Sequence, residues 1–249
     1  LLTWTLHNAW WQYRYSMDQI MLRDTIYPLL RRSINFYIHL LAETDDGKLR
    51  LPPTYSPETD VIKDANFDLS LLRWGCRTLL EASSRLGIDD PLKQKWQDIL
   101  ARTIDFPADE HGFRLGSENT APSNHRHASH LLMIYPLYLL VNIDQADTSK
   151  VLKNSIERFC SATSHQAMIA AHAAPLAAAI GRGDLVLSQL QKQADELYPN
   201  GLWHSPPCIE SSLSFANGIQ NTMLQSWGDI VRVFPALPEK WRNVAFHNL

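Results

Sequence analysis

The chain has 249 residues, of which 45% are hydrophobic and 20% charged, and its formal net charge is −3. Those values are ordinary for a globular protein, and they exclude wholesale disorder, a collagen and a small disulfide-framed domain. With 23 basic and 26 acidic residues the chain lacks the basic excess of a nucleic-acid binder, and its most apolar stretch, 131–141, is too short to span a bilayer.

Helical periodicity, with apolar residues three or four positions apart, runs through most of the chain. In chain order the pattern predicts helices over 7–17, 21–43, 66–86, 90–104, 126–141, 148–160, 164–181, 184–198 and 213–226. Long loops are expected over 48–65 and 105–125, and loops of that length in compact domains are often functional. After the last helix the apolar period shortens, which predicts strands over 230–234 and 244–246.

Consecutive helical hairpins, joined alternately by tight and long connections, indicate an all-α fold of the bundle, solenoid or toroid type. No fixed repeat period is visible in the sequence, so a regular repeat array is the weaker interpretation. A toroid of hairpins would gather its long loops on one rim, where a functional site can form.

The proline-rich loop contains a candidate general acid, Glu58, which follows Pro57. A carboxyl group on a stiff loop among aromatic side chains can be desolvated, and the raised pKa that results suits a general acid. The alternative is a solvated loop glutamate that caps the next helix. Residue types alone favour this alternative.

A second candidate segment carries three histidines within six residues, at His125, His127 and His130, together with Arg126. Imidazoles can bind zinc, but this spacing matches no standard helical zinc motif. The same side chains can donate hydrogen bonds to substrate hydroxyls or to developing charge. They can also belong to a polar helix start that satisfies buried carbonyl groups. A metal, a substrate and a structural role all stay open at this point.

Glu210 is a second candidate carboxylate, at the end of a proline-stiffened loop that also carries Trp203 and His204. Together with Glu58 it would supply the pair of carboxyl groups that glycoside hydrolysis uses. The alternative is an exposed acid near the start of the helix predicted over 213–226, where the helix dipole favours negative charge. Taken alone, Glu210 fits this alternative better.

Other catalytic motifs are absent from the sequence. There is no GxSxG elbow, no GxGxxG loop and no P-loop, so no cofactor is expected. The cysteines Cys76, Cys160 and Cys208 form no CxxC pair, which argues against a zinc ribbon and a disulfide framework.

Five short motifs follow one another along the chain. They are Ala9-Trp10 with Tyr13-Arg14-Tyr15 and Tyr27-Pro28; Ser56-Pro57-Glu58; the HRHxSHL element at 125–131 with Tyr135-Pro136; the PP…GI…LQS segment at 206–226; and PALP at 235–238 with Trp241. In this order they resemble the catalytic domain of glycoside hydrolase family 95, and the resemblance covers nearly the whole chain. The HRHxSHL element is its most specific part.

That family comprises α-L-fucosidases acting on terminal α-1,2-linked fucose, with some α-L-galactosidases. The resemblance implies an (α/α)6 toroid of helical hairpins, partial in this chain, over residues 1–228. Residues 229–249 would then begin the small β domain that usually follows. It also implies an oligosaccharide or glycan substrate. No metal site is expected, and the composition already argues against a nucleic-acid or membrane partner. A secreted or periplasmic location is expected, and the oligomeric state is left open.

Carried over residue by residue, the resemblance makes Glu58 the general acid. The family's second carboxylate falls on Glu210, where a glutamate replaces an aspartate. In the family that group works with upstream asparagines to activate water with inversion, which requires carboxyl groups roughly 6.5–9.5 Å apart. Sugar contacts are expected from His125, Arg126, His127, His130, Trp10, Trp203 and His204.

The sequence also departs from the family's pattern. Cys160 replaces an acidic residue, His165 replaces a tryptophan, and Ser211-Ser212 replaces a Gly-Asn pair. The upstream asparagine motif would lie before residue 1. These departures motivate an alternative, namely a carbohydrate-binding or catalytically weak family member, or a toroid glycosidase of different sugar specificity.

Two further alternatives come from other classes. A toroid lyase would need a tyrosine or histidine base and an acidic sugar, and a phosphorylase would cleave only with phosphate. A zinc protein would use His125, His127 and His130 as ligands.

Overall fold

The computed structural model describes residues 2–57, 60–118, 127–141, 146–161, 166–202 and 209–247. The chain forms two compact units, one from Leu1–Pro107 with Gly116–Glu118 and the other from Ala108–Leu115 with Asn119–Leu249. Within the described residues, no helix has the length and apolar character needed to cross a membrane.

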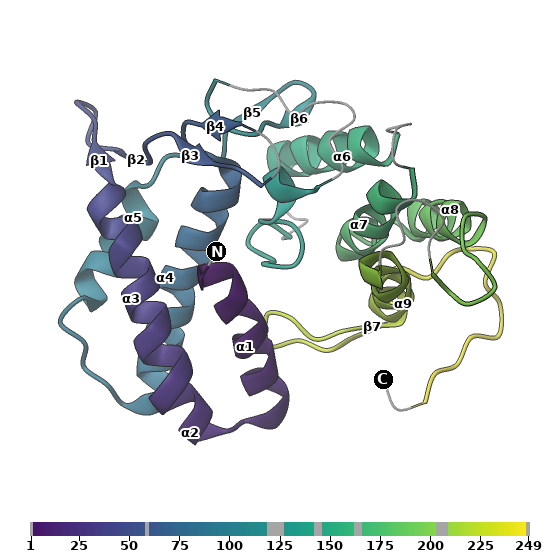
Figure 1. Ribbon diagram of the computed structural model, residues 1–249, viewed down its shortest axis with the longest axis horizontal. Helices are drawn as coiled ribbons and strands as arrows, with labels where there is room; N and C mark the ends of the chain where they lie inside the picture. The colour runs from purple at the N-terminus through teal and green to yellow at the C-terminus, as the bar shows by residue number, and fades with distance from the viewer. Residues whose placement is uncertain are drawn as a thin grey trace. The chain divides into compact units, whose positions relative to one another are not determined.

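The first unit is a set of packed helices (Figure 1). Its helices are α1 (Leu2–Ser16), α2 (Gln19–Met21), a π-helical turn (Leu22–Ile26), α3 (Tyr27–Leu40), α4 (Asn66–Leu86) and α5 (Lys93–Arg102). Helix α3 returns along α1 and also packs against α4, and α5 packs against α4 in turn. The helical prediction for this part of the chain is therefore confirmed.

Helix α4 is the buried centre of the first unit. It ends at Gly87, whose φ of +65° supplies the left-handed cap that stops a helix. Most of its residues are buried, including Leu69, Leu72 and Leu79. A side chain at Gly75 would collide with Ile34 of α3, so the absence of a Cβ lets the two helices approach closely.

A partly buried ion pair joins the start of α3 to the turn between α4 and α5. The Asp90 carboxylate accepts hydrogen bonds from the Tyr27 hydroxyl at 2.7 Å, from Arg31 Nε at 2.7 Å and from the Leu92 amide at 2.8 Å. Burial acts to raise the pKa of Asp90, but these hydrogen bonds outweigh burial and hold the pKa below its usual value. The charged form of the Asp90 carboxylate therefore stabilises the contact between α3 and the turn that joins α4 to α5.

Short antiparallel strand pairs connect the helices of the first unit. Strand β1 (Ala42–Glu43) pairs with β2 (Leu49–Arg50) across a turn, and β3 (Thr54–Tyr55) pairs with β4 (Val61–Ile62). Each strand has two residues, too few for a hydrophobic alternation that could be read from the sequence. The segment 48–65 was expected to be a loop and is partly hairpin.

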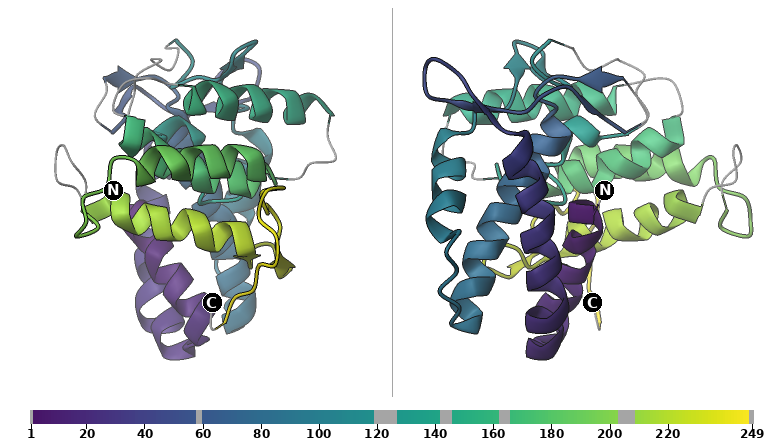
Figure 2. Two further views of the ribbon diagram at one scale, coloured as in Figure 1. Left: turned by 90° about the vertical axis from the view of Figure 1, so that its right-hand side faces the viewer. Right: turned by 60° about the vertical axis from the view of Figure 1, so that its left-hand side comes forward.

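The second unit is built around α7. Its elements are β5 (Ala108–Asp109), β6 (Gly112–Phe113), a 3₁₀ turn (Ser129–Leu131), α6 (Ala146–Cys160), α7 (Gln166–Ala179), α8 (Gly183–Ala194), α9 (Ile209–Met223), β7 (Leu224–Gln225) and β8 (Arg232–Val233). Helix α7 packs against α6, α8 and α9, which Figure 2 shows from two sides. Its alanines are small enough for close approach, and Gly218 of α9 lies against Ala174.

Among the described residues, the strands of both units form only two-stranded antiparallel pairs, and the all-α prediction is confirmed. The helix predicted over 126–141 is wrong for the part described, 127–141, which is a 3₁₀ turn followed by further turns. Pro136 explains this, because it has no N–H to donate and disfavours helical geometry in the residue before it.

The predicted C-terminal strands are mostly absent. Only Arg232–Val233 of the segment 230–234 is a strand, paired with β7, and the described residues 244–246 form none. A strand needs a partner for its backbone groups, and no described segment pairs with 244–246. The boundary of a β domain at 229 stays a prediction.

Replacing Asp90 by asparagine should lower the free energy of unfolding by about 2 kcal/mol at pH 7, because buried hydrogen bonds lose a charged acceptor. The pKa of Asp90 is lowered in the folded protein, so its contribution is complete above the unfolded pKa of about 3.9 and is lost as the pH falls through the folded pKa. Urea unfolding at a series of pH values measures both effects. The exposed neighbour Asp89→Asn is the control, and equal losses in the two variants would contradict the assignment.

Candidate functional site

The structure describes some of the predicted site residues. Those described are Trp10, His127, His130 and Glu210. Those outside the described residues are Glu58, His125, Arg126, Trp203 and His204. The distance between the carboxyl groups of Glu58 and Glu210 therefore stays a prediction.

The residues on both sides of Glu58 form the β3–β4 hairpin. Thr54 pairs with Ile62 and Tyr55 with Val61, and the Ser56 amide donates to the Asp60 carbonyl at 3.3 Å. Side chains alternate along this strand, since Tyr55 is 72% exposed and Ser56 only 1% exposed. The Ser-Pro-Glu motif thus begins at a buried residue that is held in a hairpin.

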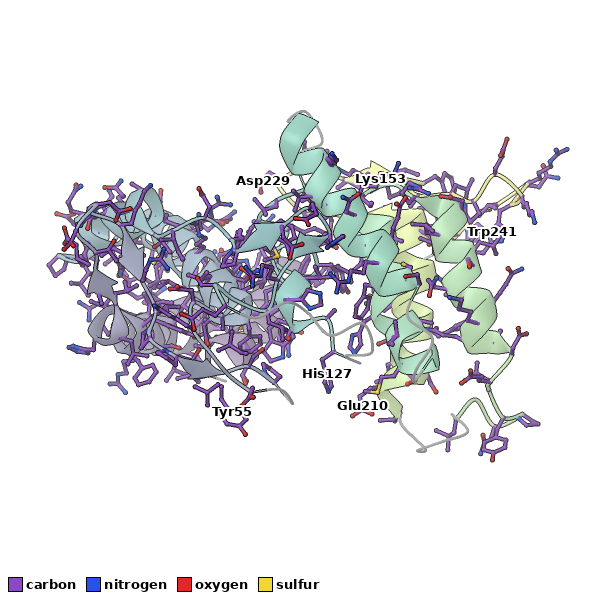
Figure 3. The ribbon with its side chains drawn as sticks, turned by 90° about the horizontal axis from the view of Figure 1, so that it is seen from above. Tyr55, His127, Lys153, Glu210, Asp229 and Trp241 are labelled. Atoms are coloured by element: carbon purple, nitrogen blue, oxygen red, sulfur yellow. The ribbon has the colours of Figure 1, made fainter. Side chains whose placement is uncertain are left out.

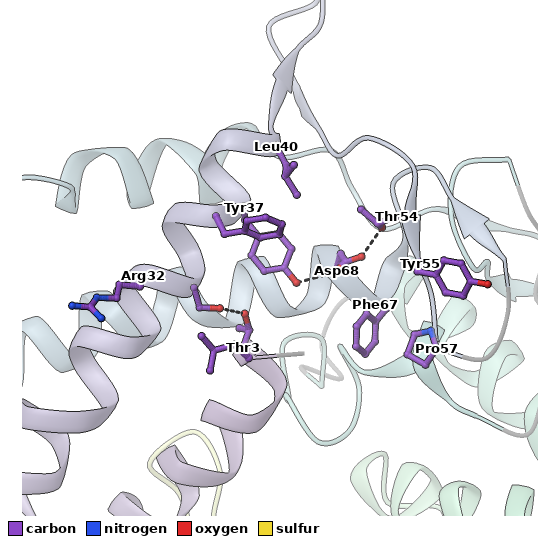
Figure 4. A pocket seen from close by; sticks show the side chains of 12 residues that line it. Thr3, Arg32, Tyr37, Leu40, Thr54, Tyr55, Pro57, Phe67 and Asp68 are labelled. Atoms are coloured by element: carbon purple, nitrogen blue, oxygen red, sulfur yellow. Dashed lines mark hydrogen bonds between the residues drawn. The ribbon is translucent and has the colours of Figure 1, made fainter.

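Two buried carboxylates hold this hairpin to the helical core. Asp68, in the first turn of α4, accepts hydrogen bonds from Thr54 Oγ1 at 2.6 Å and from the Tyr37 hydroxyl at 2.7 Å (Figure 4). Burial raises the pKa of Asp68, and the two hydrogen bonds partly offset that rise. The carboxylate therefore depends on these two donors for its stabilisation.

Asp64 lies two residues beyond β4, at the same open end of the hairpin as Thr54, and is fully buried. Its carboxylate accepts from the Leu51 amide at 3.0 Å, from Arg50 Nη1 at 2.9 Å and from Ser117 Oγ at 2.7 Å. Ser117 also donates its amide to the Lys63 carbonyl at 3.0 Å. The segment 116–118 therefore packs along the residues that leave β4. A Cβ at Gly116 would collide with the Ile62 side chain and the Lys63 carbonyl.

A hollow of about 680 Å³ lies beside the hairpin in the first unit (Figure 4). Its lining is Leu2, Thr3, Arg32, Ser33, Phe36, Tyr37, Leu40, Thr54, Tyr55, Pro57, Phe67 and Asp68. Most of these side chains are apolar or aromatic, and Phe36 is 63% exposed. The apolar wall lowers the polarity around the Asp68 carboxylate, which strengthens the hydrogen bonds it accepts.

Trp10 lies in the core of the first unit. Its side chain is 7% exposed and its ring centroid is 5.1 Å from that of Tyr13. The indole therefore has little surface available within this unit, and its predicted contact with a sugar stays untested.

In the second unit the structure brings two histidines together. The ring centroids of His127 and His172 of α7 are 6.0 Å apart, and both side chains are half-buried. His130 is 5% exposed and its ring lies edge-on to Phe159 at 6.0 Å. His172 belongs to none of the sequence motifs, so its proximity to His127 was missed.

Glu210 lies in the first turn of α9 and is exposed. The expectation that it ends a loop is wrong, because the helix begins at Ile209, four residues before the predicted start at 213. A negative charge in a first turn is stabilised by the helix dipole. In the view of Figure 3, Glu210 and His127 lie along the same edge of the second unit.

The remaining candidates for metal binding and nucleophilic chemistry are few. Within the ranges that the structure describes, no group of three or more His, Cys, Asp or Glu residues could hold a metal ion. Cys160, which stands where the family pattern has an acid, is buried, and burial raises the pKa of its thiol to about 12. That thiol is neutral at physiological pH and is not an activated nucleophile.

Comparison with known proteins supports the order of motifs. The chain matches the glycosyl hydrolase family 95 catalytic domain over residues 2–224. The chain belongs to glycosyl hydrolase family 95. This match covers both units, including the β3–β4 hairpin, His127 and α9.

A curated relative is named alpha-L-fucosidase 2, from Arabidopsis thaliana. It is 23% identical over 269 aligned residues, which include 96% of this chain and 32% of the relative. The chain thus spans about a third of the length of that relative.

Gly116→Ala should lower the free energy of unfolding by about 1–3 kcal/mol, because the added methyl group must displace the backbone beyond β4. Chemical denaturation measures the loss. Gly47→Ala is the comparison: no atom lies within 4 Å of an added Cβ there, so the change costs only the backbone strain of a φ of +75°, about 1 kcal/mol. A smaller effect at Gly116 than at Gly47 would show that the 116–118 contact is not tight.

Proposed function

We propose that the protein is a glycoside hydrolase that releases a terminal α-L-fucosyl, or related α-L-galactosyl, residue from oligosaccharides by inversion. The observation that carries this proposal is family 95 membership across residues 2–224. The relative named alpha-L-fucosidase 2 supports the sugar class at 23% identity.

In this proposal Glu58 is the general acid and Glu210 is the base or its electrostatic partner. Glu58 donates a proton to the leaving glycosidic oxygen while water attacks the anomeric carbon from the opposite face. Glu210 accepts a proton from that water. The helix dipole at the first turn of α9 favours the ionised form that a base requires, as it does for any exposed acid at that place.

Histidines of the second unit are proposed to bind the sugar, with His127 as the central residue. Its proximity to His172 adds a second imidazole to the predicted set. Neutral imidazoles both donate and accept hydrogen bonds, which suits the hydroxyl groups of a fucosyl ring. Arg126, Trp203 and His204 complete the proposed contacts, and no cofactor takes part in the reaction.

A second candidate function is carbohydrate binding with weak or no turnover. The burial of Cys160 favours it, because a neutral thiol stands where the family pattern has an acid. Any charge-dependent role of that acid is lost here. Binding of a fucosylated oligosaccharide without release of fucose would support this second function over hydrolysis.

Glu58→Gln in the full-length protein should lower kcat on an α-1,2-fucosylated oligosaccharide by about 100-fold or more, because the leaving oxygen loses its proton donor. Initial rates of fucose release measure the change, and an α-L-galactosyl substrate tests the related sugar. Glu239→Gln, a matched change at an exposed glutamate in the second unit, is the control. An unchanged rate in Glu58→Gln would refute the acid role.

The stereochemistry of the product tests the role of Glu210. Inversion at an α-linked fucoside releases β-L-fucose first, and proton NMR during the first minutes of reaction distinguishes the anomers. We also expect Glu210→Gln to reduce kcat by at least about 10-fold while leaving substrate binding intact. Release of the α anomer first would point to a retaining mechanism and overturn the assignment of Glu210 as a base.

A further inference from the structure

The β3–β4 hairpin is too short for its own hydrogen bonds to fix its register and its position on the helices. Each strand contributes two residues, so few ladder hydrogen bonds hold the register. A slip of one residue would turn every side chain to the opposite face. The observed alternation, with Tyr55 exposed and Ser56 buried, therefore needs a contact from outside the hairpin.

Asp68 supplies that contact through one specific hydrogen bond. Thr54 Oγ1 donates to Asp68 Oδ2 at 2.6 Å, which ties β3 to the first turn of α4. The other oxygen of the same carboxylate accepts from Tyr37 of α3 at 2.7 Å. The first bond reaches the hairpin, whereas the second joins two helices.

Burying a carboxylate costs desolvation free energy, which hydrogen bonds to the carboxylate only partly offset. Apolar side chains could join the same two segments without that cost. Hydrogen bonds to a buried carboxylate are short and directional, so they fix the donor more closely than apolar packing does. Here the fixed donor is Thr54, four residues before Glu58. At the same open end of the hairpin, the Asp64 carboxylate accepts hydrogen bonds from Leu51 and Ser117.

We propose that Asp68 is a positioning residue, which acts through Thr54 to set the β3–β4 hairpin and thereby the approach of Glu58 to the glycosidic oxygen. This inference rests on the proposed function of Glu58. A catalytic group that is displaced by about 1 Å can lose about 100-fold in rate, so loosening the hairpin reduces proton transfer more than it reduces substrate binding.

The test compares two isosteric changes at the same carboxylate. Thr54→Val removes the bond from Asp68 to the hairpin, and Tyr37→Phe removes the bond from Asp68 to α3. Each variant leaves the buried carboxylate one donor short, so we expect similar losses of thermal stability. In the full-length protein, Thr54→Val should lower kcat by about 10-fold or more with KM nearly unchanged, while Tyr37→Phe stays within about 2-fold of wild type.

Thr54→Ser is the rescue variant, because it restores the hydroxyl donor and should recover most of the lost kcat. Equal kcat losses in Thr54→Val and Tyr37→Phe would mean that Asp68 acts only on stability, which would overturn the proposal. A wild-type kcat in Thr54→Val would also overturn it. If Glu58→Gln is inactive in the latter case, the proposed function stands and this inference alone fails.

Amide hydrogen exchange tests whether Asp68 positions the β3–β4 hairpin, and it does so without an activity measurement. Thr54→Val should speed exchange at the Ser56 amide, which bonds within the hairpin, relative to the Leu69 amide of α4. Tyr37→Phe should leave that ratio unchanged. The same ratio in all three proteins would overturn the positioning role even if the full-length protein does not hydrolyse the tested substrates.

Discussion

The buried carboxylates of Asp68 and Asp64 hold the β3–β4 hairpin of the first unit, and Asp68 also joins it to two helices. A charge buried in a helical core is tolerated only where donors surround it, and here the donors come from α3 and from β3. One group therefore joins a helix start, a neighbouring helix and a hairpin. The segment that carries the Ser-Pro-Glu motif is thus held by the core.

The second unit is organised by a different constraint. Helix α7 is rich in alanine, and α6, α8 and α9 pack against it. Small side chains allow close helix packing, as at the contact of Gly218 with Ala174. Because α9 begins at Ile209, the carboxylate of Glu210 falls in its first turn, where the dipole favours ionisation.

Local sequence signals located the regular helices well. The bounds of α4 agree with the prediction over 66–86, because an apolar stripe and the terminal Gly87 both act within a few residues of the helix. The helix predicted over 126–141 was wrong for its described part, because the prediction did not take into account that Pro136 disfavours helical geometry there. The β3–β4 hairpin gave no periodic signal, because two-residue strands are shorter than any period that a sequence can display.

The sequence by itself determined the helical class and, through its motifs, membership of glycosyl hydrolase family 95. These properties depend on residues that are close along the chain, or on short motifs in fixed order. Only the tertiary structure decided which donors reach Asp68 and that His172 approaches His127. Tyr37 and Asp68 are far apart in the chain, and no local rule encodes a contact that forms only when separate elements pack together.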